Sequence, residues 1–153
     1  MPNWTYSIWF KLDKLEVGVL AILFGTRYSG GAFSDLPLYV RPSNKHITSY
    51  NNHVLDVPIE INLDLWYNLT AVVESSVMSI FINGELIIEG TNYTPSTDDG
   101  SDGLFNNYGG NYYISGKYKN DYPAYLNGSI DNVRLYNRAL NKYEVLEIYN
   151  QEK

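Results

Sequence analysis

The stretch "WYNLTAVVESSVMSIFINGELIIEG", residues 66–90, contains three apolar runs, and Asn83 and Gly84 separate the last two. Asn-Gly between apolar runs is typical of a two-residue type I′ hairpin turn, because both turn residues must adopt a positive φ. The stretch therefore predicts a meander of three antiparallel strands.

The composition of the whole chain agrees with this β-rich stretch. The chain has 153 residues, of which 44% are hydrophobic and 18% charged, and it contains 15 Tyr. Tyr and other aromatic residues favour strands, and this length is common for a single domain. We therefore predict one all-β domain over residues 1–153, large enough for a two-sheet sandwich.

Charge and cysteine content exclude several classes of protein. The net charge is -6 and only 11 residues are basic, which argues against a protein that follows nucleic-acid phosphates. The chain has no Cys, so disulfides, thiol nucleophiles and Cys-ligated zinc are excluded, but the cellular compartment stays open. The longest apolar run, residues 17–25, is shorter than the ~20 residues of a membrane helix. We expect a soluble domain whose export signal has been removed, without membrane insertion.

Strand patterns cover most of the rest of the chain. Residues 4–12 alternate apolar and polar positions, as a half-buried strand does. The continuous apolar run at 17–26 predicts a fully buried strand. Further predicted strands are 38–41, 46–51, 54–61 and 112–115.

The end of the chain predicts a strand followed by a helix. In the strand at 129–137, the alternation breaks at Asp131 and Asn132, which indicates a β-bulge. Asn141, followed three residues later by Glu144, forms a capping-box pattern at the start of a short helix.

"GSIDNVRLYNRAL" at 128–140, followed by this helix start, resembles the terminal signature of LamG-like jelly rolls in the concanavalin A-like lectin/glucanase superfamily. "WTYSIWFKLDK" at 4–14, the meander from residue 63 to 87 and "YYISG" at 112–116 are similar to other family segments. The resemblance implies a two-sheet antiparallel jelly-roll sandwich with a short C-terminal helix. It also implies a curved face and rim loops that bind saccharides, bind other proteins or have no known ligand.

The resemblance departs from the family at the start of the chain. Family members usually carry a further strand before the Trp-bearing strand, and that strand normally neighbours the last one. If it is missing, the strand at 129–137 has an unpaired edge, which natural proteins tend to cover. We therefore expect either another protein or chain to cover this strand, or a changed sheet order.

A catalytic role is not predicted. The superfamily's retaining glucanases resemble one another in an acidic E-x-D-x-x-E strand, and this sequence lacks it. Glycoside hydrolysis needs two carboxyl groups about 5–9.5 Å apart. We therefore predict that the chain is not an enzyme and has no catalytic residue.

Asp131 is the candidate metal ligand. In LamG-like folds, the Asp of the "GSID" segment often helps to bind a structural Ca²⁺ or accepts a hydrogen bond from the start of the chain. A hard cation such as Ca²⁺ prefers oxygen ligands. The alternative is that the Asp131 carboxylate only stabilises the bulge.

Several segments combine aromatic rings, which stack on sugar C–H groups, with polar groups that bind hydroxyls. The candidate carbohydrate-binding residues are Arg27, Tyr28, Tyr50, Asn52, His53, Tyr118, Asp121 and Tyr122. The alternative for each Tyr is packing over a sheet edge.

The sequence as a whole predicts a non-catalytic, lectin-like module of an extracellular protein, whose partner is a glycan or polysaccharide. We expect its location to be extracellular or at a cell or virion surface. The alternative is a structural, adhesion or protein-interaction module, including a phage or viral fibre, without a glycan site. The Tyr-rich composition suits both, because Tyr is also enriched at protein interfaces.

Overall fold

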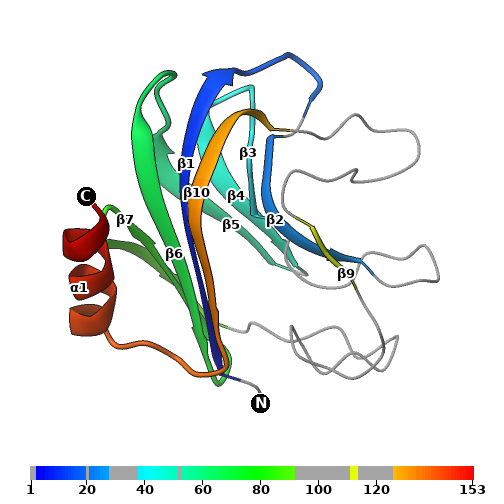
Figure 1. Ribbon diagram of the computed structural model, residues 1–153. Coiled ribbons are helices and arrows are strands. Elements are labelled where there is room, and N and C mark those ends of the chain that lie inside the picture. Colours follow the sequence, from blue (N-terminus) through cyan, green and yellow to red (C-terminus); the bar gives the residue numbers. More distant parts are fainter. Residues whose placement is uncertain (1–2, 20, 28–37, 52, 92–110, 114–125) are drawn as a thin grey trace.

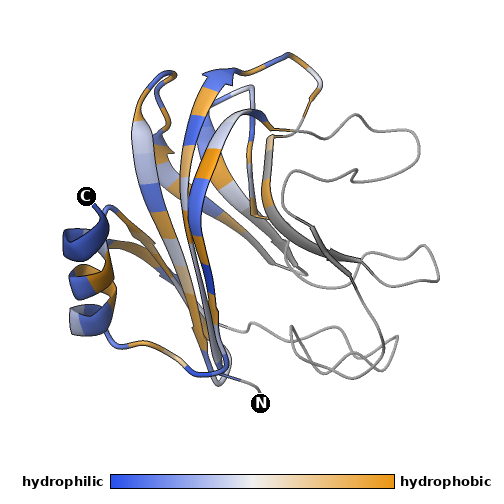
Figure 2. Ribbon diagram, in the orientation of Figure 1, coloured by the Kyte–Doolittle hydropathy of each residue, from blue (hydrophilic) through white to orange (hydrophobic). Residues whose placement is uncertain are grey.

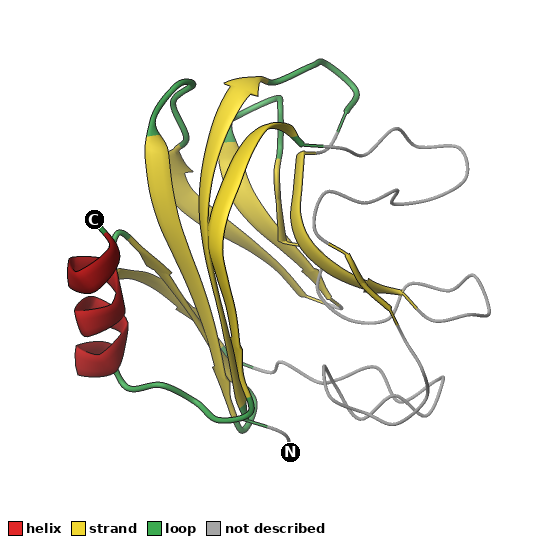
Figure 3. Cartoon of the chain, in the orientation of Figure 1, coloured by secondary structure: helices red, strands yellow, loops and turns green. Residues whose placement is uncertain are grey.

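The computed structural model of the chain describes residues 3–19, 21–27, 38–51, 53–91, 111–113 and 126–153. These residues form two five-stranded antiparallel sheets and one helix (Figures 1 and 3). The predicted two-sheet antiparallel sandwich with a C-terminal helix is therefore confirmed.

The first sheet has the strand order β10-β1-β6-β7-β8, and the second has the order β5-β4-β3-β2-β9. The strands of the first sheet are β1 (Trp4–Lys14), β6 (Trp66–Glu74), β7 (Val77–Ile82), β8 (Glu85–Gly90) and β10 (Asn127–Tyr136). Those of the second are β2 (Ala21–Arg27), β3 (Leu38–Val40), β4 (His46–Asn51), β5 (His53–Glu60) and β9 (Asn111–Tyr113). The helix, α1, spans Lys142–Glu152.

The predicted meander is present as β6, β7 and β8. Asn83 and Gly84 have φ values of 52° and 80°, and Ile82 pairs with Glu85 across the turn, as a type I′ hairpin requires. The Asn83 side chain also accepts a hydrogen bond of 2.9 Å from the backbone N–H of Asn68 on the neighbouring strand. Asn83 therefore both forms the turn and ties it to β6.

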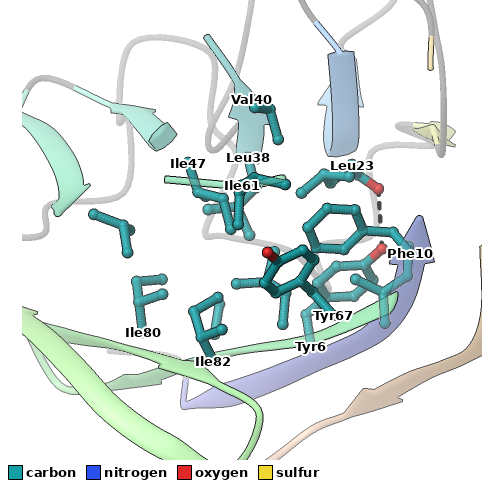
Figure 4. Packing of buried hydrophobic residues seen from close by; sticks show 14 of the residues in the cluster. Tyr6, Phe10, Leu23, Leu38, Val40, Ile47, Ile61, Tyr67, Ile80 and Ile82 are labelled. Carbon is teal, nitrogen blue, oxygen red and sulfur yellow. Dashed lines mark hydrogen bonds between the residues drawn. The ribbon is translucent and has the colours of Figure 1, made fainter. Parts of the chain in front are cut away.

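The core lies between the two sheets. Apolar side chains from alternate positions of β1 and β6 face those of the second sheet, and hydropathy alternates visibly along the front strands (Figure 2). Figure 4 shows the Tyr6 hydroxyl donating a hydrogen bond of 3.0 Å to the backbone carbonyl of Leu23. Burial raises the pKa of the Tyr6 phenol well above its usual value. This hydrogen bond therefore joins the two sheets through a neutral group.

The predicted strand at 17–26 is partly wrong. The strand begins at Ala21, and Val17 is 99% exposed in a turn. Gly18 has a φ of 81°, and the N–H of Val19 donates to the carbonyl of Glu16 at 3.0 Å. The turn reverses the chain at Gly18, because glycine adopts this backbone conformation without steric cost, and this outweighs the apolar pattern.

β10 carries the predicted bulge and forms a sheet edge. Its register against β1 shifts between the pairs Ser7–Arg134 and Trp9–Asp131, so that two residues face one, and Asn132 has a φ of 48°. Among the described strands, β10 pairs only with β1. The unpaired edge expected for this strand is therefore present in the described part of the sheet.

The helix α1 covers the outer face of the first sheet (Figure 1). The predicted capping box is present: the Asn141 side chain accepts from the N–H of Glu144, whose carboxylate accepts from the N–H of Asn141 at 2.9 Å. Val145 is fully buried against the sheet. The ring of Tyr149 stacks on Trp9 at 5.7 Å, and the Trp9 indole N–H donates to Glu152 at 2.8 Å. The helix is thus fixed at both ends.

Candidate functional site

The strand register of the second sheet brings three predicted carbohydrate-binding positions to one end. Arg27 ends β2, Tyr50 lies near the end of β4, and His53 begins β5. Tyr50 pairs with Val54, next to His53. β3 lies between β2 and β4, and the register places Arg27 two residues beyond the level of Tyr50, so their backbones are about 12 Å apart. Positions 23 residues apart in sequence therefore share one rim.

The other predicted positions are Tyr28, Asn52, Tyr118, Asp121 and Tyr122, and they lie outside the described residues. The side chains of Arg27, Tyr50 and His53 also lie outside the description, which gives only their backbone. The prediction that these residues bind a saccharide stays a prediction.

A cluster of polar side chains that the sequence analysis missed lies along β4 and β5. The Asp56 carboxylate lies 3.1 Å from Nδ1 of His46 and accepts a bond of 3.4 Å from the Thr48 hydroxyl. Thr48 and Asp56 are paired across the two strands. Thr48 is fully buried, whereas the side chains of His46 and Asp56 are 27% and 45% exposed. The cluster therefore offers partly exposed hydrogen-bonding groups that extend from Asp56, two residues from the Tyr50–Val54 pair, to His46 at the opposite end of β4.

Lys45 and Glu60 extend this polar surface toward the far end of the sheet. The Lys45 ammonium lies 2.7 Å from the Glu60 carboxylate. The hydrogen bond from Lys45 lowers the pKa of Glu60. Spacing alone could not identify these contacts, because each pairs side chains at least eight residues apart that only the strand register brings together.

Asp131 lies in the β10 bulge, where its carboxylate accepts a hydrogen bond of 2.8 Å from the N–H of Asn132. This is the local contact that the sequence analysis gave as the alternative to calcium. No group of three or more His, Asp or Glu side chains that could hold a metal occurs in the part of the chain that the structure describes. The calcium prediction stays a prediction.

Membrane insertion through a helix has no support among the described residues. The described helix, α1, spans Lys142–Glu152 and is too short and too polar to cross a bilayer.

Sequence comparison identifies the family. The family model described as "Concanavalin A-like lectin/glucanases superfamily" matches residues 2–146, which is most of the chain. The chain belongs to this superfamily. The family assignment made from the terminal "GSIDNVRLYNRAL" signature is therefore confirmed. No curated protein matches this chain at a significant level.

Several solved structures share the fold. Domain 4 of an extracellular arabinanase from Geobacillus stearothermophilus, solved with arabinotriose, has a TM-score of 0.72 and 20% identity. A candidate carbohydrate-binding protein from Bacteroides ovatus has a TM-score of 0.74 and 16% identity. The sialidase of Trypanosoma rangeli has a TM-score of 0.72 and 18% identity.

The matches cover nearly all of this chain but only part of the solved chains. They cover 97%, 95% and 97% of this chain, and 66%, 40% and 22% of the arabinanase domain structure, the Bacteroides protein and the sialidase. At these identities the likeness shows the fold alone.

Proposed function

We propose that this chain is a non-catalytic, lectin-like module of an extracellular or surface protein, and that it binds a glycan at the rim formed by the ends of β2, β4 and β5. The observation that carries the proposal is the register that brings the backbones of Arg27, Tyr50 and His53 to the same rim. Membership of the superfamily supports it. Two solved structures with this fold also support it, since one is an arabinanase domain in complex with arabinotriose and the other is a candidate carbohydrate-binding protein.

The residue types at this rim suit a sugar. A Tyr ring can stack on the C–H face of a pyranose or furanose, and a guanidinium group can donate two parallel hydrogen bonds to adjacent hydroxyls. Asp56, two residues along β5 from the Tyr50–Val54 pair, adds an acceptor. A shallow site of this kind binds sugars through several weak contacts rather than one deep pocket.

The carboxylates described on the second sheet support a binding role rather than hydrolysis. The Asp56 carboxylate contacts His46 and Thr48, and the Glu60 carboxylate pairs with Lys45. The hydrogen bond from Lys45 lowers the pKa of Glu60, whereas the general acid of a glycosidase needs a raised pKa. We therefore expect purified protein to release no reducing sugar from plant, algal or host polysaccharides. Turnover abolished by replacing a single Asp or Glu would overturn this part of the proposal.

The binding site is tested by replacing one aromatic residue at a time. Tyr50→Ala should weaken glycan binding by about 1 kcal/mol or more, because an aromatic platform is lost. Tyr143→Ala is the matched control, since Tyr143 is 71% exposed on α1, on the other sheet. A loss of binding in both variants, or in neither, would contradict the rim site.

A structural calcium ion at Asp131 remains part of this proposal, since carboxylate oxygen suits Ca²⁺. If the ion is present, EDTA should lower the melting temperature of the wild type and leave that of Asp131→Ala unchanged. If EDTA has no effect on the wild type, or acts equally on both, Asp131 stabilises only the bulge through Asn132.

A second candidate function is protein interaction through the β10 edge. Val133 and Leu135 on this edge strand are 38% and 40% exposed, which is unusual for apolar strand residues. An added strand from another chain would bind the open backbone groups of β10. A β10 edge that serves as an interface predicts a protein that self-associates or binds a partner, and Val133→Lys should abolish this association without affecting glycan binding.

A further inference from the structure

A second surface feature lies on the outer face of the first sheet, away from the proposed glycan rim. It is an open groove of about 620 Å³ between β8 and the start of α1. Its apolar lining includes Val72 of β6 and Phe81 of β7, which are nearly buried and form the floor, together with Leu86 of β8 and Leu140. Every residue that lines the groove lies within the described part of the chain.

The helix covers only part of the apolar surface in this groove. Val72, Phe81 and Leu140 are each 5% exposed and pack with Val145 under the helix. Leu86 pairs with Phe81 across β7 and β8, but it is 48% exposed. The apolar row that begins under α1 therefore continues into solvent at Leu86, where it can receive one more apolar side chain.

The rim of the groove is acidic. Glu74 and Glu89 line it and are exposed, and the Glu89 carboxylate accepts a bond of 3.0 Å from the Ser79 hydroxyl. Among the described residues, no Lys or Arg forms an ion pair with either carboxylate. Lys142 is the basic side chain in the lining, and its ammonium lies 5.2 Å above the ring of Tyr143.

This combination of groups favours one kind of occupant. The exposed part of the groove is aliphatic and offers no open aromatic face to a sugar, because Phe81 is only 5% exposed. A second copy of this chain carries a net charge of -6, and an anionic lipid surface is also negative, so the acidic rim repels both. A basic partner with an apolar side chain is attracted by both the rim and the floor.

We propose that this groove is a docking site for an extended segment of a partner protein in which an apolar residue is flanked by Lys or Arg. The apolar side chain packs against Leu86 over the edge of Phe81, and the flanking basic groups pair with Glu74 and Glu89. The groove and the glycan rim lie on different sheets, so one module can hold a glycan and a protein segment at the same time.

The test is an NMR titration of ¹⁵N-labelled protein with a blocked peptide in which Leu alternates with Lys, and with a second peptide in which Leu alternates with Glu. The Lys peptide should cause saturable shifts of the amide signals around Ser79 and Leu86, and these should weaken as salt increases. The Glu peptide should cause no saturable shift there. Absence of saturation with the Lys peptide, or equal binding of both peptides, would overturn the proposal.

Two pairs of variants locate the binding site. Leu86→Ser should weaken Lys-peptide binding about tenfold, whereas Leu65→Ser should not, although Leu65 is 53% exposed. Glu89→Lys should weaken binding about fivefold, and Glu85→Lys, on the same strand but outside the groove lining, should have less effect. All four positions are exposed, so each variant is expected to fold, and melting curves check this. Equal effects within either pair would place binding elsewhere and overturn the proposal.

Discussion

The outer face of the first sheet and that of the second are built differently. On the first sheet, α1 buries Val145, stacks Tyr149 on Trp9 and fixes its last turn through the Trp9–Glu152 hydrogen bond. On the second sheet, the described contact between His46 and Asp56 stays partly exposed, whereas Thr48, which also bonds to Asp56, is buried. Burial of apolar area dominates stability, whereas exposed polar pairs contribute little. The first sheet and the shared core should therefore set stability, and the second outer face should tolerate change and serve for binding.

The largest effect that distinguishes structural from tolerant positions should come from a substitution that creates a cavity in the shared core. Phe10 is fully buried and stacks on Tyr67 at 5.8 Å. Phe10→Ala should lower the free energy of unfolding by about 3–5 kcal/mol, measured by urea denaturation. Trp66→Ala, at a residue 44% exposed, is the control and should cost much less. Similar losses in the two variants would show that exposure does not separate structural from tolerant positions.

Removal of the Tyr6–Leu23 hydrogen bond, which joins the two sheets, should give the next largest effect on stability. Tyr6→Phe removes the hydroxyl that donates to the Leu23 carbonyl and leaves that buried acceptor without its partner. The free energy of unfolding should fall by about 1–2 kcal/mol. Tyr143→Phe, at a residue 71% exposed, should leave it unchanged within the error of the same measurement.

Removal of the polar cluster on the second sheet should matter less for stability. Asp56→Ala breaks the contacts with His46 and Thr48, and the Asp56 side chain is 45% exposed. We expect the free energy of unfolding, measured by urea denaturation, to fall by less than about 1 kcal/mol, and glycan binding to weaken. A loss as large as that of Tyr6→Phe would make this cluster part of the structural core instead.

The smallest predicted effect concerns pH at the start of α1. The hydrogen bond from Arg138 and the N–H of Asn141 lower the pKa of Glu144 from 4.5 to about 2. A carboxyl whose folded pKa is lowered stabilises the fold fully above about pH 4.5, and this stabilisation is lost as the pH falls toward 2. Melting temperatures measured from pH 7 to 2 should therefore fall less for Glu144→Gln than for the wild type. Glu147→Gln, on the same helix, should follow the wild type; if it behaves like Glu144→Gln, the effect is not specific to the capping box.

Local signals made much of the fold predictable. The Asn83-Gly84 turn and the capping box of Asn141 and Glu144 depend on residues within a few positions of one another. Both predictions were confirmed. The strand predicted at 17–26 was partly wrong because the chain turns at Gly18 and the strand begins only at Ala21. An apolar pattern alone cannot show where such a reversal falls.

The candidate site was less predictable because it depends on pairing between distant strands. Arg27, Tyr50 and His53 could be selected by residue type, but only the register shows that their backbones share a rim. The His46–Asp56 contact and the groove beside Leu86 were missed for the same reason, since their residues come together only in the folded sheet.

The central claim is that the rim of the second sheet binds a glycan, whereas the first sheet and the shared core determine the stability of the fold. A glycan array probed with wild-type protein and with Tyr50→Ala, each checked by its melting temperature, tests this directly. The proposal predicts that the wild type binds at least one glycan and that Tyr50→Ala loses this binding with an unchanged melting temperature. No glycan bound by the wild type, or glycan binding that survives Tyr50→Ala, would contradict it.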